Sequence, residues 1–139
     1  MWITPESERR PALVRLTRRY RFSASHRLHA EGLSEEENRA VYGKCNNPYG
    51  HGHDYVMDVT VRGEVDPRLG RLISIEQLDA FVRRTVVEPM AHRNLNVEVR
   101  EFAALVPTTE NLARVAAARL LDSGSFTASD PALSVWPMM

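Results

Sequence analysis

Three histidines are the residues of this sequence best suited to chemistry. His51 and His53 lie two positions apart, and alternate side chains of a β-strand point to the same face. They share this parity with Tyr55 and Met57, on the apolar face of an expected strand. Two inward imidazoles are costly to bury unless something satisfies their nitrogen atoms. A metal does so, and neutral imidazole is a favoured zinc ligand.

His26 is the candidate for a third ligand. It follows an expected strand earlier in the chain. If that strand pairs antiparallel with the strand of His51 and His53, His26 can face this pair. Three protein ligands leave one coordination position for water or substrate, which is the pattern of catalytic zinc. The competing interpretation is that a His-x-His pair marks ordinary surface or loop histidines that bind nothing.

Cys45, His92 and Glu110 are weaker candidates when each is considered alone. Cys45 lies in a polar loop rich in glycine and asparagine, where Lys44 would favour the thiolate, although a single cysteine is more often a buried small hydrophobe. His92 alone reads as a loop histidine. Glu110 falls in the first turn of an expected helix, where the helix dipole favours a carboxylate in any case.

The elements that must position these residues follow from periodicity. Alternation of apolar and polar residues predicts strands, and apolar residues at helical spacing after Ser74 and Thr108, which can cap, predict helices. The expected order begins with a strand at 14–22, a loop at 30–50 that contains a helical turn near 34–41, and a strand at 53–65. Two helices follow, one from 74 to Pro89 and one from 108 to about 123. A short strand at 133–136 comes last, and Pro137 is expected to stop it. This order indicates an α+β fold.

Composition limits the classes of protein. The 139 residues fit a single domain, 1–139, in which residues 1–12 are expected to be a loose arm. Lysine plus arginine equals aspartate plus glutamate at 18 each, which argues against a nucleic-acid partner and permits self-association. One cysteine, no long apolar run and no visible signal peptide predict a cytoplasmic protein without a membrane partner.

Several motifs in order resemble 6-pyruvoyltetrahydropterin synthase. The resemblance runs from about residue 18 to about 121, and the spacing from Cys45 to His51 favours this type over the related 6-carboxytetrahydropterin synthase. The motifs are FSASHRL at 22–28, YGKCNNPYGHGHDY at 42–55, GEVDP at 63–67, HRNLN at 92–96 and PTTENLA at 107–113.

The resemblance implies a role for each matching residue. The zinc ligands would be His26, His51 and His53, the proton-abstracting base Cys45, and the relay histidine His92. Glu110 would hold the pterin, with Thr108 and Thr109 beside it. The implied reaction converts 7,8-dihydroneopterin triphosphate to 6-pyruvoyltetrahydropterin with loss of triphosphate. Its redox change is internal, so no nicotinamide or flavin is needed and Zn²⁺ is the expected cofactor. Arg27 and Lys44 are candidates to hold the triphosphate.

The resemblance also implies an architecture. The tunnelling-fold subunit is an antiparallel sheet with two helices on one face, and subunits form a homohexamer with sites at their interfaces. The sequence departs from the family at Ala91, where an aspartate usually precedes the relay histidine. It also stops at Met139, before a second pocket glutamate and a last strand. An active lyase and a catalytically impaired homologue that keeps zinc and pterin binding therefore both remain open, as does 6-carboxytetrahydropterin synthase activity.

Overall fold

Two long antiparallel strands position the rest of the chain. In the computed structural model, which describes residues 13–123 and 132–138, β1 (Leu13–His26) pairs with β2 (His51–Glu64) over the full length of both. The register runs without interruption from Leu13 opposite Glu64 to His26 opposite His51. β3 (Ala132–Met138) pairs antiparallel with the other edge of β2, giving the strand order β1-β2-β3.

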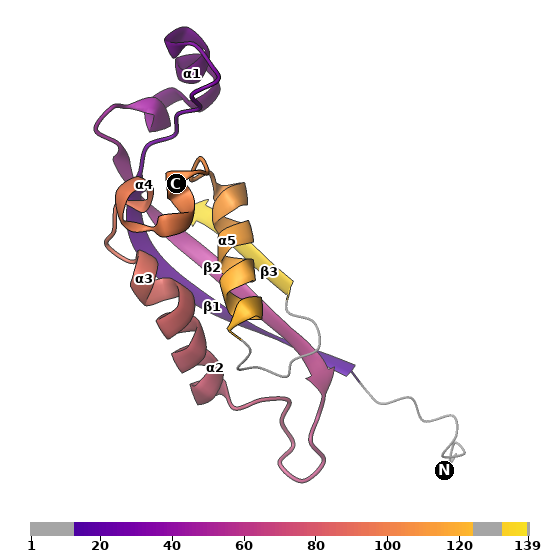
Figure 1. Cartoon of the computed structure of the whole chain (residues 1–139). Coiled ribbons are helices and arrows are strands. Elements are labelled where there is room, and N and C mark those ends of the chain that lie inside the picture. The colour runs from indigo at the N-terminus through magenta and orange to yellow at the C-terminus, as the bar shows by residue number, and fades with distance from the viewer. Residues whose placement is uncertain (1–12, 124–131, 139) are drawn as a thin grey trace.

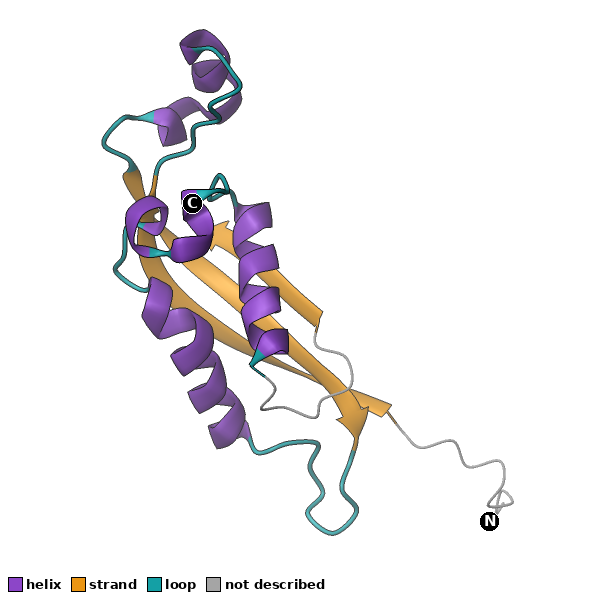
Figure 2. Ribbon diagram, viewed as in Figure 1, coloured by secondary structure: helices purple, strands orange, loops and turns teal. Residues whose placement is uncertain are grey.

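Helices α2, α3 and α5, whose bounds follow, cover one face of this sheet (Figures 1 and 2), as expected for an α+β fold. Strand alternation sends every second side chain into the layer between sheet and helices. The buried side chains on this face are Tyr20, Phe22, Ala24 and His26 of β1, and Tyr55, Met57, Val59 and Val61 of β2. The same alternation that builds the core therefore aims His51 and His53 toward the helical side.

Two helical segments form the covering layer. The first comprises α2 (Ile75–Val82), a π-helical turn (Arg83–Val87) and α3 (Glu88–Met90), and the second is α5 (Thr109–Asp122). Their predicted caps are confirmed, because the Ser74 hydroxyl accepts from the Gln77 N–H at 3.3 Å and the Thr108 hydroxyl from the Asn111 N–H at 3.2 Å. Leu78, Phe81 and Leu112 are among the helix residues buried against the sheet.

Three expectations from periodicity are wrong in detail. Ile75 was expected on the buried face of its helix but is 39% exposed, since it lies in the first turn at the edge of the layer. Pro89 does not end the helix, which continues to Met90 after the π-helical turn. Pro137 does not stop the last strand, because β3 pairs only with β2 and an edge strand tolerates proline.

The connection from β1 to β2 projects beyond the end of the sheet (Figure 1). It contains α1 (Glu35–Tyr42), whose Ser34 and Glu37 form a capping box, and a 3-10 turn (Gly43–Asn46) that carries Cys45. The fully buried Asn38 side chain holds this connection in shape. Its amide accepts from the Ala30 N–H at 2.8 Å and donates to the backbone carbonyls of Ala30, Leu33 and Ser34 at 3.0–3.2 Å.

Two shorter helical pieces complete this end of the molecule. α4 (Leu95–Glu98) and a 3-10 turn (Arg100–Ala103) lie between α3 and α5. Within the described residues, no helix is long and apolar enough to cross a membrane. The arm expected at residues 1–12 lies outside the described part of the chain.

Asn38→Ala should loosen the connection without unfolding the sheet. The variant removes the partner that the Asn38 side chain supplies to the Ala30 N–H and the Leu33 carbonyl, whereas the Ala30 and Ser34 carbonyls keep the backbone N–H groups of Leu33 and Asn38. Leaving such groups unsatisfied costs about 1–3 kcal/mol. Hydrogen exchange should therefore accelerate across residues 28–46 and stay unchanged in β1 and β2. Val41→Ala, at a position on α1 that is 64% exposed, is the control and should leave exchange unaltered. Equal acceleration in β2 would contradict a local role for Asn38.

Candidate metal centre

Four metal-ligating side chains converge where β1 ends and β2 begins. His26 and His51 are direct cross-strand partners, and His53 lies two residues further along β2. The imidazole centroids of His53 lie 4.6 Å from that of His26 and 4.2 Å from that of His51. Cys45 joins them from the preceding 3-10 turn, and one ligand atom of each of the four residues lies within 4.8 Å of the others. The histidines thus meet as strand parity predicted, and the cysteine joins them.

His26 is prepared to bind a cation. Its side chain is 4% exposed, and its Nδ1 lies 2.9 Å from the Pro107 carbonyl, which can only accept, so Nδ1 carries the proton. The lone pair is then on Nε2, which is buried and has no hydrogen-bond partner. Burial lowers the pKa of His26 to about 4, so the ring is neutral at ordinary pH. An unsatisfied lone pair facing two more imidazoles fits a metal ion such as zinc.

Cys45 contacts two of the histidines. Its Sγ lies 3.0 Å from His51 Nε2 and 3.7 Å from His53 Nε2, and the residue is partly buried. Burial raises the pKa of the Cys45 thiol, which is opposite to the direction expected from the neighbouring Lys44. The lysine is exposed to solvent, whereas the sulfur faces the histidines. Lys44 therefore gives no reason to expect a thiolate at this position.

The N-terminal end of α5 is attached to the cluster. The Pro107 carbonyl that fixes His26 immediately precedes Thr108, the cap of α5. Thr108 and Thr109 are partly buried there, while Glu110 is exposed in the first turn. The segment expected to hold a pterin thus begins one residue from a contact with a candidate metal ligand.

His92 lies outside the cluster, at the outer edge of β1. It adopts φ +59°, its backbone N–H donates to the Ser23 carbonyl at 2.6 Å, and its side chain is exposed. It borders two surface hollows together with Ser23 and Asp54. Asp54 accepts a hydrogen bond from the Ser23 hydroxyl, and its place in β2 turns it away from the face of His51 and His53. This parity makes Asp54 a poor substitute for a carboxylate beside the ligand face, but Asp54 lines the same two hollows as His92.

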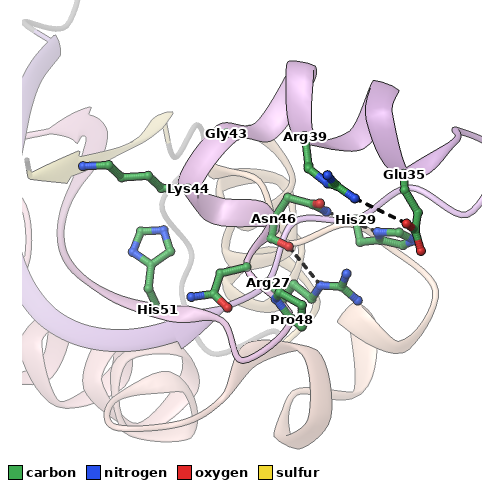
Figure 3. A pocket seen from close by; sticks show the side chains of 10 residues that line it. Arg27, His29, Glu35, Arg39, Gly43, Lys44, Asn46, Pro48 and His51 are labelled. Carbon is green, nitrogen blue, oxygen red and sulfur yellow. Dashed lines mark hydrogen bonds and ion pairs between the residues drawn. The ribbon is translucent and has the colours of Figure 1, made fainter.

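A basic hollow adjoins the cluster on the side of α1 (Figure 3). It measures about 530 Å³, and His51 forms part of its wall. Arg27, Arg39 and Lys44 line it, and Glu35 is the one carboxylate among its lining residues. The Arg39–Glu35 pair, at 3.4 Å, is largely exposed and so holds Arg39 only weakly. Sequence reasoning named Arg27 and Lys44 but missed Arg39 and His29, because only the folded connection brings α1 over the start of β2.

Comparisons with known proteins point to one family. A family model described as 6-pyruvoyl tetrahydropterin synthase matches residues 15–135. The chain is similar to 6-pyruvoyl tetrahydrobiopterin synthase of Poecilia reticulata (52% identity over 98 residues, 70% of this chain and 67% of the relative) and of Homo sapiens (44% over 111 residues, 80% and 77%). The solved structure of Caenorhabditis elegans 6-pyruvoyl tetrahydropterin synthase superposes with TM-score 0.81 at 35% identity, covering 94% of this chain and 99% of that one.

Metal analysis should find about one Zn²⁺ per chain, the stoichiometry of a single site of this type. His51→Ala should weaken zinc binding by more than about 100-fold, since even losses outside the ligand shell cost 10–100-fold. His92→Ala is the matched control and should bind zinc as the wild type does, because His92 is not in the cluster. Full zinc occupancy in the double variant His51→Ala/His53→Ala would rule the site out.

Proposed function

The chain belongs to the 6-pyruvoyl tetrahydropterin synthase family, a family of lyase-type enzymes, and we propose that it converts 7,8-dihydroneopterin triphosphate to 6-pyruvoyltetrahydropterin with loss of triphosphate. One observation carries the proposal. Three imidazoles, one with a buried and unpartnered Nε2, surround a point that a cysteine sulfur also reaches. This is the arrangement needed for metal-assisted proton abstraction beside an oxygen-bearing carbon.

Each residue of the cluster has a separate task in this proposal. His26, His51 and His53 would hold a zinc ion, which supplies polarisation of the substrate side-chain oxygens and so acidifies the adjacent C–H. The Cys45 sulfur, 3.0 Å from His51 Nε2, takes that proton as the thiolate. The Pro107 carbonyl keeps the proton of His26 on Nδ1, so that Nε2 stays available to the metal. Glu110, with Thr108 and Thr109, holds the pterin ring at the start of α5.

The basic hollow is the proposed place for the triphosphate. Its wall includes His51, so a substrate whose side chain reaches the metal can extend its anionic tail toward Arg27, Arg39 and Lys44. Guanidinium groups suit phosphate oxygens because they donate two parallel hydrogen bonds. The excess of cations over the single carboxylate also favours a highly charged anion over a neutral side chain.

The position of His92 suits a role between subunits more than a role within one chain. It does not reach Cys45 through any contact within the cluster, and it lies exposed on the outer edge of β1. We propose that the chain forms the homohexamer that the family resemblance implies, in which His92 returns a proton at a site shared with a neighbouring subunit. This exposed histidine is held at the strand edge by backbone hydrogen bonds, from its own N–H to the Ser23 carbonyl and from the Ser25 N–H to the carbonyl of the neighbouring Arg93, and is well placed for such a role.

Ala91 favours a second candidate function, a zinc- and pterin-binding homologue with impaired turnover. Alanine cannot accept a hydrogen bond from His92, so no carboxylate at this position fixes its tautomer. Asp54 shares the two hollows with His92 and is the available substitute. Release of triphosphate from dihydroneopterin triphosphate by the purified protein separates the two functions, and analysis of the pterin product separates both from 6-carboxytetrahydropterin synthase activity.

Arg27→Ala should raise the KM for dihydroneopterin triphosphate with little change in kcat. A hydrogen bond between charged groups contributes about 1.5–3 kcal/mol, so the expected rise is about 10- to 100-fold. The reason is that Arg27 binds the triphosphate away from the reacting carbons. Arg68→Ala, in the exposed turn after β2, is the control and should leave KM unchanged. An unchanged KM in the Arg27 variant would place the triphosphate elsewhere.

Ala91→Asp should raise kcat without tightening zinc binding. Aspartate would hold one tautomer of His92 and stabilise the imidazolium formed during proton return. The measurement is steady-state triphosphate release, compared among Ala91→Asp, Asp54→Asn and the double variant. If Asp54 already supplies the carboxylate, Asp54→Asn lowers kcat and Ala91→Asp restores it. A gain that persists after His92→Ala would show that position 91 does not act through His92.

A further inference from the structure

We propose that Cys45 is the fourth metal ligand of the resting protein, so that three imidazole nitrogens and one thiolate sulfur close the coordination sphere until substrate displaces the sulfur. The simpler expectation is a three-histidine site whose fourth position is open to water. The displacement step rests on the proposed function, whereas the four-ligand resting state does not.

Distances within the cluster carry the first step. Tetrahedral zinc binds nitrogen at about 2.0–2.1 Å and sulfur at about 2.3 Å, which sets nitrogen–sulfur separations of roughly 3.6 Å. The Cys45 sulfur lies 3.0 Å from His51 Nε2 and 3.7 Å from His53 Nε2. A neutral thiol has one hydrogen and can donate to only one of the two rings. The 3.7 Å separation matches the one expected across a shared zinc ion, whereas the 3.0 Å separation is that of a hydrogen bond between the sulfur and His51.

His26 supplies an independent indication that a cation lies among these atoms. Its Nε2 is buried and has no hydrogen-bond partner, and His26 is one of the four residues of the group. Its other nitrogen is committed to Pro107, so rotation of the ring cannot satisfy Nε2 without breaking that bond. Because one ligand atom of each of the four residues lies within 4.8 Å of the others, a metal bound among them would satisfy both the sulfur and this nitrogen.

The backbone around Cys45 keeps the sulfur at this point. The Cys45 carbonyl accepts from the Leu28 N–H at 2.7 Å, and the Asn46 side-chain amide donates to the Leu28 carbonyl at 2.8 Å. Gly50 then returns the chain to β2 at φ +69°, and a side-chain carbon there would lie 2.8 Å from the His26 carbonyl oxygen. The turn that carries Cys45 is thus packed directly on the strand end that carries His26.

The consequence concerns the Cys45 thiolate, which is the proposed base: binding of substrate would release it from the metal. Three imidazoles and the Cys45 thiolate would hold the metal, and the thiol would give up its proton to solvent when it became a ligand. A substrate side-chain oxygen that took the place of the sulfur would release Cys45 as a thiolate. The freed thiolate then lies beside the carbon whose proton it takes, and before that moment it is protected from other electrophiles.

Cobalt substitution tests the coordination directly. The Co²⁺-loaded wild type should show strong near-ultraviolet sulfur-to-cobalt charge-transfer absorption together with the visible bands of tetrahedral cobalt. Cys45→Ser should lose the charge-transfer absorption and still bind Co²⁺, with affinity lowered by about 10- to 100-fold, while His92→Ala keeps the full spectrum. Circular dichroism confirms that each variant is folded. A wild-type spectrum without charge transfer, or one that Cys45→Ser leaves unchanged, would overturn the proposal.

Two further measurements separate this proposal from the proposed function. Iodoacetamide should label Cys45 much more slowly with Zn²⁺ bound than after chelation, and equal rates would contradict metal ligation. Adding 7,8-dihydroneopterin triphosphate to the Co²⁺ protein should abolish the charge-transfer absorption, and its persistence at saturating substrate would contradict the displacement step. A protein that shows the charge transfer but releases no triphosphate keeps the four-ligand site and loses the proposed reaction.

Discussion

The uninterrupted pairing of β1 with β2 is the constraint on which the rest of the structure depends. It sets His26 opposite His51, and the strand period of two then places His53 on the same face. A slip of one residue would turn these imidazoles away from the helices and expose Tyr55 and Met57, which are almost fully buried. Core packing and metal geometry are therefore fixed by one register, and the apolar face protects the alignment of the ligands.

The sequence was sufficient for whatever depends on short-range periodicity. Alternation predicted both long strands and the shared face of the histidines, and hydroxyl caps predicted where α2 and α5 begin. The position of Cys45 was beyond such reasoning, because its approach to His51 depends on a turn packed against Leu28. Arg39 joined the basic hollow for the same reason, since no spacing in the sequence relates α1 to the start of β2.

His92 shows the opposite limit of sequence reasoning. Strand parity alone sends Asp54 to the face away from His51 and His53, but the position of His92 follows from backbone hydrogen bonds between its loop and the edge of β1. A long-range contact of this kind leaves no periodic signal. No sequence pattern predicts the buried contact between Pro107 and His26 either, although it joins the start of α5 to the end of β1 across most of the chain.

The connection over residues 27–50 begins and ends at the metal centre, because His26 and His51 are paired across the strands. Its ends are thus clamped whatever lies between them, and lengthening a closed loop costs only about 0.6 kcal/mol for each doubling. Exposed residues of α1 such as Arg39 can therefore be exchanged with little effect on the metal site, as long as Asn38 still holds the connection that carries Cys45. The exposed face of α1 is thus a part of the chain in which substrate preference can change while the residues of the cluster stay in place.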